Sequence, residues 1–198
     1  YYCRKHKKLC TPINSIVKHL IRYTYDTISR LNEFSKLKKN VFSEVIRGDS
    51  READILKEIK KQNPEFYRLL AMKKIDGIFT SPPYVGQIDY HEQHAYAYEL
   101  FDIPRKDDKE IGSLFKGQGQ KAKEEYVDEI SKVFINISKF VKDNGNFFVV
   151  ANDKYNLYPI IAKKSGLKIV EQFKRPVLNR TERDRQPYAE IIFHMKKI

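Results

Sequence analysis

Residues Ile75 to Tyr84 read IDGIFTSPPY, a strand and turn from which the fold class can be worked out. The apolar run from Ile75 to Phe79 predicts a buried β-strand. Pro82 and Pro83 end that strand, because proline fixes φ and has no N–H to donate to a sheet. A turn with polar side chains directly after a buried strand is expected where the carboxyl ends of parallel strands meet.

Helices and strands alternate on both sides of this stretch. The spacing of apolar residues predicts helices over residues 11–35, 51–62, 64–72, 92–101, 121–142 and 157–164. Short apolar runs predict strands over residues 42–46, 75–80, 146–151, 167–173 and 190–195. Such alternation is typical of one α/β domain, with a mostly parallel sheet and helices on both faces. We therefore expect an N-terminal helical segment at 1–40 and an α/β domain at 41–198, with a polar loop at 102–125.

Composition and charge exclude some classes of protein and favour one kind of partner. The 198 residues are 41% hydrophobic and 32% charged, which is typical of a globular protein and not of a disordered one. No apolar run reaches the roughly 18 residues of a membrane helix, and the first ten residues do not read as a secretory signal. The formal net charge of +12 favours a polyanionic partner such as nucleic acid. An ordinary basic protein is the alternative.

Cysteine is scarce. The chain has two cysteines, Cys3 and Cys10, so a disulfide framework is excluded and a reducing compartment such as the cytoplasm is expected. Cys3, His6 and Cys10 provide three potential zinc ligands with no fourth nearby, so we expect no metal site.

The turn after the central strand has the features of a binding site for a base. Ser81 supplies a hydroxyl, the two prolines supply carbonyls outside any sheet, and Tyr84 supplies an aromatic face. Acceptors beside an aromatic ring suit a flat heterocycle with an exocyclic amino group. The alternative is a strand that simply ends in a Pro-Pro turn with a packed tyrosine.

This turn also resembles a known motif. The string TSPPY at Thr80–Tyr84, and more fully TSPPYVGQIDY at Thr80–Tyr90, resembles motif IV of the S-adenosylmethionine-dependent DNA amino-methyltransferases. The turn Gly48-Asp49-Ser50-Arg51 resembles their motif III. The strands at 146–151, 167–173 and 190–195 match the fifth, sixth and seventh strands of that family's Rossmann-like sheet.

The resemblance implies roles for particular residues. Ser81 and the Pro82 carbonyl would accept hydrogen bonds from the target amino group, Pro83 would keep the loop rigid, and Tyr84 would stack on a base flipped out of double-stranded DNA. Asp49, with Ser50 and Thr80, would lie at the cofactor S-adenosylmethionine. Serine at the first motif position favours N4 of cytosine over N6 of adenine. A role in restriction-modification, at the nucleoid of a prokaryotic cell, follows from the family.

Further residues are candidates for DNA contact. They are Tyr90 and His91 after motif IV, and Arg175, Arg180 and Arg183 in the basic connection at 174–185. The lysines of the 102–125 segment make it a candidate DNA-facing loop. The alternative for Tyr90 and His91 is that they only pack a helix. The alternative for the basic connection at 174–185 is a solvated loop.

One family feature is missing from the sequence. Members hold the cofactor on a glycine-rich turn after the first strand, and the chain has no such turn. Gly117-Gln118-Gly119 has the glycine spacing but no strand before it. We therefore expect the sheet to lack its first one or two strands, and the turn to lie before residue 1, after residue 198 or on a second chain. An RNA amino-methyltransferase, and a non-catalytic nucleic-acid-binding subunit, are the rival functions.

Overall fold

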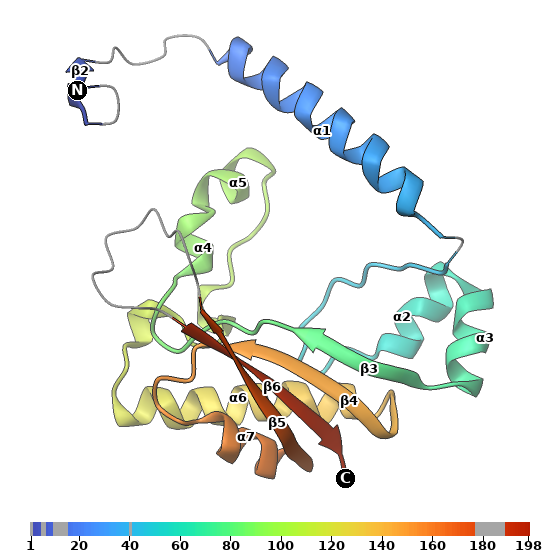
Figure 1. Cartoon of the computed structure of the whole chain (residues 1–198). Coiled ribbons are helices and arrows are strands. Elements are labelled where there is room, and N and C mark those ends of the chain that lie inside the picture. Colours follow the sequence, from blue (N-terminus) through green and yellow to red (C-terminus); the bar gives the residue numbers. More distant parts are fainter. Residues whose placement is uncertain (1, 5–6, 10–15, 40, 177–188) are drawn as a thin grey trace. The chain divides into compact units, whose positions relative to one another are not determined.

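The computed structural model describes residues 2–4, 7–9, 16–39, 41–176 and 189–198 (Figure 1). The chain divides into two compact units, Tyr1–Ser43 and Glu44–Ile198, and each is described by itself. Within the described ranges, no helix is both long and apolar enough to cross a lipid bilayer.

The first unit holds a short hairpin and one long helix. Strands β1 (Tyr2–Cys3) and β2 (Lys8–Leu9) pair in antiparallel fashion, and α1 spans Val17–Leu37. The helix predicted at 11–35 is confirmed from Val17 onward, and residues 11–15 lie outside the described residues. His6 and Cys10 also lie outside them, so the expected lack of a metal site stays a prediction.

A four-stranded sheet organises the second unit. Its strands are β3 (Ile75–Thr80), β4 (Val141–Ala151), β5 (Leu167–Pro176) and β6 (Ala189–Lys197), in the spatial order β3-β4-β6-β5. β3 runs parallel to β4, and β6 runs antiparallel to both β4 and β5. Three of the four strands therefore point in one direction, as expected, but the sheet is mixed: β3–β4 is the parallel pair, and the reversed β6 makes both of its pairs antiparallel.

The described residues of the same unit form six α-helices. They are α2 (Ile55–Gln62), α3 (Pro64–Met72), α4 (Tyr90–Gln93), α5 (Ala95–Leu100), α6 (Gln120–Ser138) and α7 (Tyr158–Lys164). The start of α2 is capped by Asp54, whose side chain accepts from the Lys57 amide at 3.0 Å. The start of α3 is capped by Asn63, with Pro64 in the first turn.

Several predicted boundaries are wrong. Residues 42–46 form no strand, because no strand in the described part of the chain forms a ladder with them. The helix predicted at 92–101 is split at His94 into α4 and α5. Residues 120–125 belong to α6 and not to a loop. The same helix ends at Ser138 and not at residue 142, since β4 already begins at Val141, whose side chain is fully buried.

The hydrophobic core lies between the sheet and α6 with α7. Along β4, alternate residues such as Phe147 and Val149 are fully buried, as the period of two of a strand requires. The ring of Phe147 meets Phe134 of α6 edge to face at 6.2 Å. The ring of Phe193 in β6 stacks on Tyr158 of α7 at 5.0 Å. Figure 1 shows both helices along one side of the sheet.

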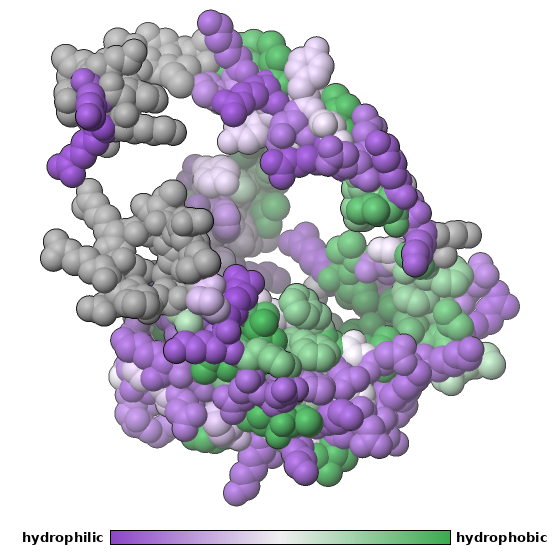
Figure 2. Space-filling view, viewed as in Figure 1, coloured by the Kyte–Doolittle hydropathy of each residue, from purple (hydrophilic) through white to green (hydrophobic). Residues whose placement is uncertain are grey.

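The opposite face of the sheet is partly open. Phe79 of β3 aligns with Phe148 of β4, and its side chain is 78% exposed. In Figure 2, hydrophobic side chains reach the surface over the sheet, within a surface that is otherwise largely hydrophilic. The expected second helical layer does not cover Phe79. Among the described strands, β3 pairs only with β4, so its other edge is unpaired.

Candidate active site

Three chain segments meet at the carboxyl edge of the sheet. β3 ends at Thr80, which lies beside Val149 of β4, so the Ser81–Tyr84 turn projects from this edge. β6 begins at the same edge because it runs antiparallel, with Ile191 opposite Ala151. The topology therefore brings the start of β6 next to a turn that precedes it by more than 100 residues.

Side chains of α6 and α7 hold the second half of the turn, Pro83 and Tyr84, in place. The hydroxyl of Tyr126 donates to the Pro83 carbonyl at 2.9 Å and lies 3.0 Å from the hydroxyl of Tyr158. Both tyrosines are buried, and burial raises the pKa of Tyr126 to about 12 and raises the pKa of Tyr158. The two hydroxyls are therefore neutral hydrogen-bonding groups that fix the turn.

Tyr84 is held by the last strand. Its hydroxyl donates to Glu190 Oε1 at 2.7 Å, and the other oxygen of Glu190 lies 3.0 Å from the guanidinium of Arg175. The Tyr84 ring is half-buried and packs against the core. The structure thus brings Tyr84 and Arg175 together through Glu190. No pattern in the sequence singled out Glu190.

The first half of the turn offers hydrogen-bond acceptors. Ser81 is exposed and Pro82 is buried. Among the described residues, none hydrogen-bonds to the Ser81 side chain or to the Pro82 carbonyl. These are the two acceptors that the resemblance implies, and neither is used by another group in the described part of the chain.

The segment after the turn is fastened to residues 112–118. Gly86 donates its amide to the Gly112 carbonyl at 2.8 Å, and its own carbonyl accepts from the Gln118 side chain at 2.8 Å. The Leu114 amide donates to the Ile88 carbonyl at 3.2 Å. This part of the predicted 102–125 loop is therefore packed against motif IV.

A buried carboxylate positions the predicted DNA contacts Tyr90 and His91. Glu110 is 8% exposed and accepts from the Tyr90 amide at 2.6 Å, at the start of α4. Its other oxygen lies 3.3 Å from Nδ1 of His91, and the His91 ring stacks on Tyr98 at 5.0 Å. Like Glu190, Glu110 was not predicted from the sequence.

The motif III turn is anchored on α6. Arg51 donates to both carboxylate oxygens of Asp49, at 2.8 and 2.6 Å, and forms an ion pair with Glu129 of α6. Asn136 of α6 donates to the carbonyls of Ser50 and Ala53, at 3.2 and 3.0 Å. The Arg51 guanidinium lowers the pKa of Asp49 to about 2. The Arg51 amide also donates to Asp49 Oδ1 at 3.0 Å, so about one of the four lone-pair sites of the carboxylate remains for a further hydrogen bond.

This anchoring predicts a pH-dependent stability. The folded pKa of Asp49 is about 2, below its usual 3.8, so the ion pair stabilises the protein above about pH 4 and is lost as the pH falls toward 2. The Asp49 side chain is 23% exposed, and solvent screening limits the contribution to about 1 kcal/mol. We expect Asp49→Asn to lower the free energy of unfolding by that amount at pH 6, and urea titrations should show the difference vanish near pH 2. A difference that is the same at every pH would contradict this explanation.

Asp49 and His91 line one cavity of about 830 Å³. None of the four residues Ser81–Tyr84 lines it, but Ile111 does, and the neighbouring Gly112 binds Gly86. The cavity therefore adjoins motif IV through residues 111–112. Its full lining is Arg47, Gly48, Asp49, Ser50, Arg51, His91, His94, Ala97, Tyr98, Ile103, Pro104, Lys106, Lys109 and Ile111.

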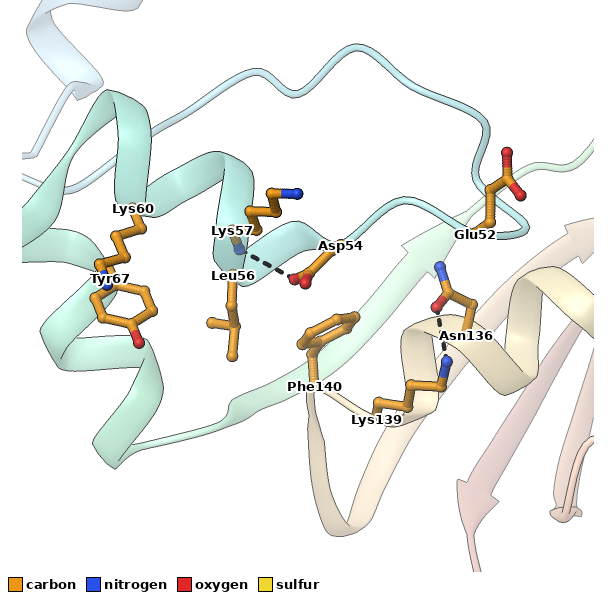
Figure 3. A pocket seen from close by; sticks show the side chains of 9 residues that line it. All are labelled: Glu52, Asp54, Leu56, Lys57, Lys60, Tyr67, Asn136, Lys139 and Phe140. Atoms are coloured by element: carbon orange, nitrogen blue, oxygen red, sulfur yellow. Dashed lines mark hydrogen bonds between the residues drawn. The ribbon is translucent and has the colours of Figure 1, made fainter.

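A second cavity, of about 670 Å³, lies between α2, α3 and the end of α6. Figure 3 shows Leu56 and Phe140 at its apolar centre and Lys139 bonded to Asn136, with Lys60 beside the ring of Tyr67. None of the predicted site residues lines this cavity.

The remaining predictions have mixed outcomes. Asp153, which is not one of the candidate residues named from the sequence, follows β4; its carboxylate accepts from the amides of Leu157 and Tyr158 at the start of α7, at 2.6 and 3.1 Å, and is thus a helix-capping group. Burial raises its pKa. Arg180 and Arg183 lie outside the described residues, so their DNA contacts stay predictions.

Comparison with known proteins confirms the resemblance in sequence. No protein-family model matches the chain. Over 196 residues, 99% of its length, the chain is 61% identical to the Type II methyltransferase M.MjaII of Methanocaldococcus jannaschii. The aligned part is 37% of that protein, so the chain spans little more than a third of this relative's length. It is therefore homologous to a segment of a Type II methyltransferase.

The similarity of the chain to solved structures is weaker than its similarity to M.MjaII. A putative DNA modification methylase from Thermus thermophilus aligns with a TM-score of 0.38 and 14% identity, over 76% of this chain and 52% of that one. The M1.HpyAVI–SAM complex aligns with a TM-score of 0.37 and 16% identity, over 78% of this chain and 53% of that one.

Proposed function

We propose that the protein to which this chain belongs transfers a methyl group from S-adenosylmethionine to the exocyclic amino group of a base in DNA. The observation that supports this most directly is the TSPPY turn. It projects from the carboxyl edge of the sheet, is fixed by Tyr126 and Glu190, and leaves the Ser81 hydroxyl and the Pro82 carbonyl as acceptors. The 61% identity to a Type II methyltransferase agrees with this chemistry. DNA as substrate implies a cytoplasmic, nucleoid-associated location.

In this proposal the turn positions the amino group and stabilises the charge that develops on it. The Ser81 hydroxyl oxygen and the Pro82 carbonyl oxygen each accept a hydrogen bond from the amino group, which directs the nitrogen lone pair toward the methyl donor. As the new N–C bond forms and the sulfur–methyl bond breaks, leaving the electron pair on the sulfur of the demethylated cofactor, the nitrogen would become positive, and the same two oxygens would stabilise that charge. One proton then leaves the nitrogen to water. Tyr84 stacks on the base and keeps it out of the duplex.

The cavity at Asp49 fits the adenosine part of the cofactor. Its size and its mixed lining, with apolar Ile103, Pro104 and Ile111 beside polar Asp49 and Ser50, suit a nucleoside. Asp49 is ionised at neutral pH and retains a lone pair for a ribose hydroxyl or an adenine amino hydrogen. When bound, the cofactor supplies an electrophilic methyl group. Thr80, at the end of β3, is a further candidate contact.

We further propose that another segment, on the same or a second chain, pairs with the unpaired edge of β3 and carries the glycine-rich cofactor turn. The 78% exposed Phe79 and the unpaired edge of β3 among the described strands support this. In native folded proteins, exposed apolar strand edges are normally covered by other parts of the structure. The first strands that the family resemblance requires would fill this place.

The finer specificity also belongs to the proposal. Ser81 at the first motif position favours N4 of cytosine over N6 of adenine, and a restriction-modification role follows from the resemblance. His91 and Arg175 would contact the DNA, together with Tyr90, Arg180 and Arg183. Glu110 and Glu190 would hold His91 and Tyr84 in place.

Nucleoside mass spectrometry tests the proposal. The complete reading frame is expressed in a host that lacks DNA methylation, beside an empty vector and a Tyr84→Ala variant, and both DNA and RNA are digested. We expect N4-methylcytosine in DNA from the wild type only. N6-methyladenine in its place would reassign the base. Methylation confined to RNA, or no new mark from a folded protein, would contradict the proposed reaction.

A further inference from the structure

A lysine–tyrosine cluster lies next to the motif IV segment. The ring of Tyr155, just after β4, has the Lys123 ammonium 4.0 Å from its centre and the Lys154 ammonium 5.4 Å from it. The Tyr155 ring is half-buried and packs against the core. Two cations on one anchored ring are a defined arrangement and not two freely rotating surface chains.

Gln118 connects this cluster to motif IV. The Tyr155 hydroxyl donates to the side-chain oxygen of Gln118, and the amide nitrogen of Gln118 donates to the Gly86 carbonyl at 2.8 Å. Gly86 is two residues beyond Tyr84. One side chain therefore spans the distance between the cluster and the segment that carries the base-binding turn.

The two ammonium groups keep their charge available. Among the described residues, neither Lys123 nor Lys154 forms an ion pair, whereas nearby Lys116 pairs with Glu125. The first turn of α6, which leads to Lys123, holds no acidic residue. A contact with an aromatic ring orients an ammonium group without neutralising it, so both lysines still attract an anion.

We propose that Lys123, Lys154 and Tyr155 bind the phosphate backbone of the DNA strand beside the target base. This inference rests on the proposed function and adds a DNA contact to it. Lysine binds phosphate as a point charge, and phosphate contacts set the position of a protein on DNA. A cluster tied to motif IV by one glutamine is placed to set the register between the backbone and the flipped base.

Salt-dependent DNA binding tests this inference in the complete protein. The double variant Lys123→Gln/Lys154→Gln is compared with Lys163→Gln/Lys168→Gln, which removes the same charge. Lys163 and Lys168 are exposed, lie where α7 ends and β5 begins, at the opposite edge of the sheet from motif IV, and form no ion pair within the described part of the chain.

The binding of a labelled duplex is followed by fluorescence anisotropy from 50 to 200 mM salt. The slope of log K against log salt is negative, and we expect the cluster variant to make it less steep by about 2, at about 0.9 per phosphate contact. Binding at 50 mM salt should weaken roughly tenfold. The Lys123→Arg/Lys154→Arg variant should retain the wild-type slope. Equal slope changes in the two glutamine variants, no change in the cluster variant, or no DNA binding by the wild type would overturn the inference.

Failure of the proposed function gives a different result. If the complete wild-type protein leaves no methyl mark while the cluster variant still loses slope, the DNA contact stands and the reaction does not. If the mark is made while the cluster variant binds DNA like the wild type, only the phosphate contact is overturned.

Discussion

Tyr84→Ala in the complete protein is expected to lower the rate of methyl transfer to DNA by up to about 100-fold. Stacking of a base on one aromatic side chain contributes about 1–3 kcal/mol, and each 1.4 kcal/mol is a factor of ten in rate. Transfer of labelled methyl from S-adenosylmethionine to duplex DNA measures this loss.

Tyr84→Phe is the matched control for this variant. It keeps the ring and removes the hydroxyl that bonds to Glu190, at 2.7 Å in the wild type, so we expect a loss of no more than about fivefold, equivalent to about 1 kcal/mol. Thermal unfolding of both variants shows whether the domain is still folded. An unchanged rate in Tyr84→Ala would remove the stacking role. Equal losses in both variants would assign the effect to the Glu190 contact.

Gly86→Ala is expected to lower the free energy of unfolding by about 3 kcal/mol. Gly86 has a φ of +62°, and a Cβ atom there would lie 2.5 Å from the Gly117 carbonyl oxygen and from Cγ of Gln118. The left-handed backbone costs an alanine about 1 kcal/mol, and forced displacement of packed atoms costs about 1–3 kcal/mol more. Urea unfolding followed by circular dichroism measures the loss.

Gly166→Ala separates the two costs. Gly166 has a φ of +67°, with nothing within 4 Å of the added Cβ, so only the backbone cost of about 1 kcal/mol is expected. Similar losses in the two variants would show that the close approach of Gly86 to residues 117–118 contributes nothing. Since Gln118 also binds Tyr155, Gly86→Ala should disturb the DNA contact proposed for that cluster.

Local patterns in the sequence were sufficient for most of the secondary structure. The 3.6-residue period over Tyr126, Ile130 and Phe134 reflects burial of one helix face, and all three side chains are buried in α6. The run from Ile75 to Thr80 is a strand that ends before Pro82, as the chemistry of proline requires. The prediction at 42–46 was wrong because strand propensity does not say whether a partner strand is present.

The sequence by itself determined the α/β class, the position of the TSPPY turn at a strand end and the type of chemistry that its side chains allow. These follow from local periodicity, from proline and from residue types. The tertiary structure alone decided which groups hold the site in place. Glu190 is 106 residues from Tyr84, and Asn136 is 86 residues from Ser50. Such contacts arise because β6 is reversed and inserted between β4 and β5, and because α6 packs under the motif III turn. No local pattern encodes either arrangement.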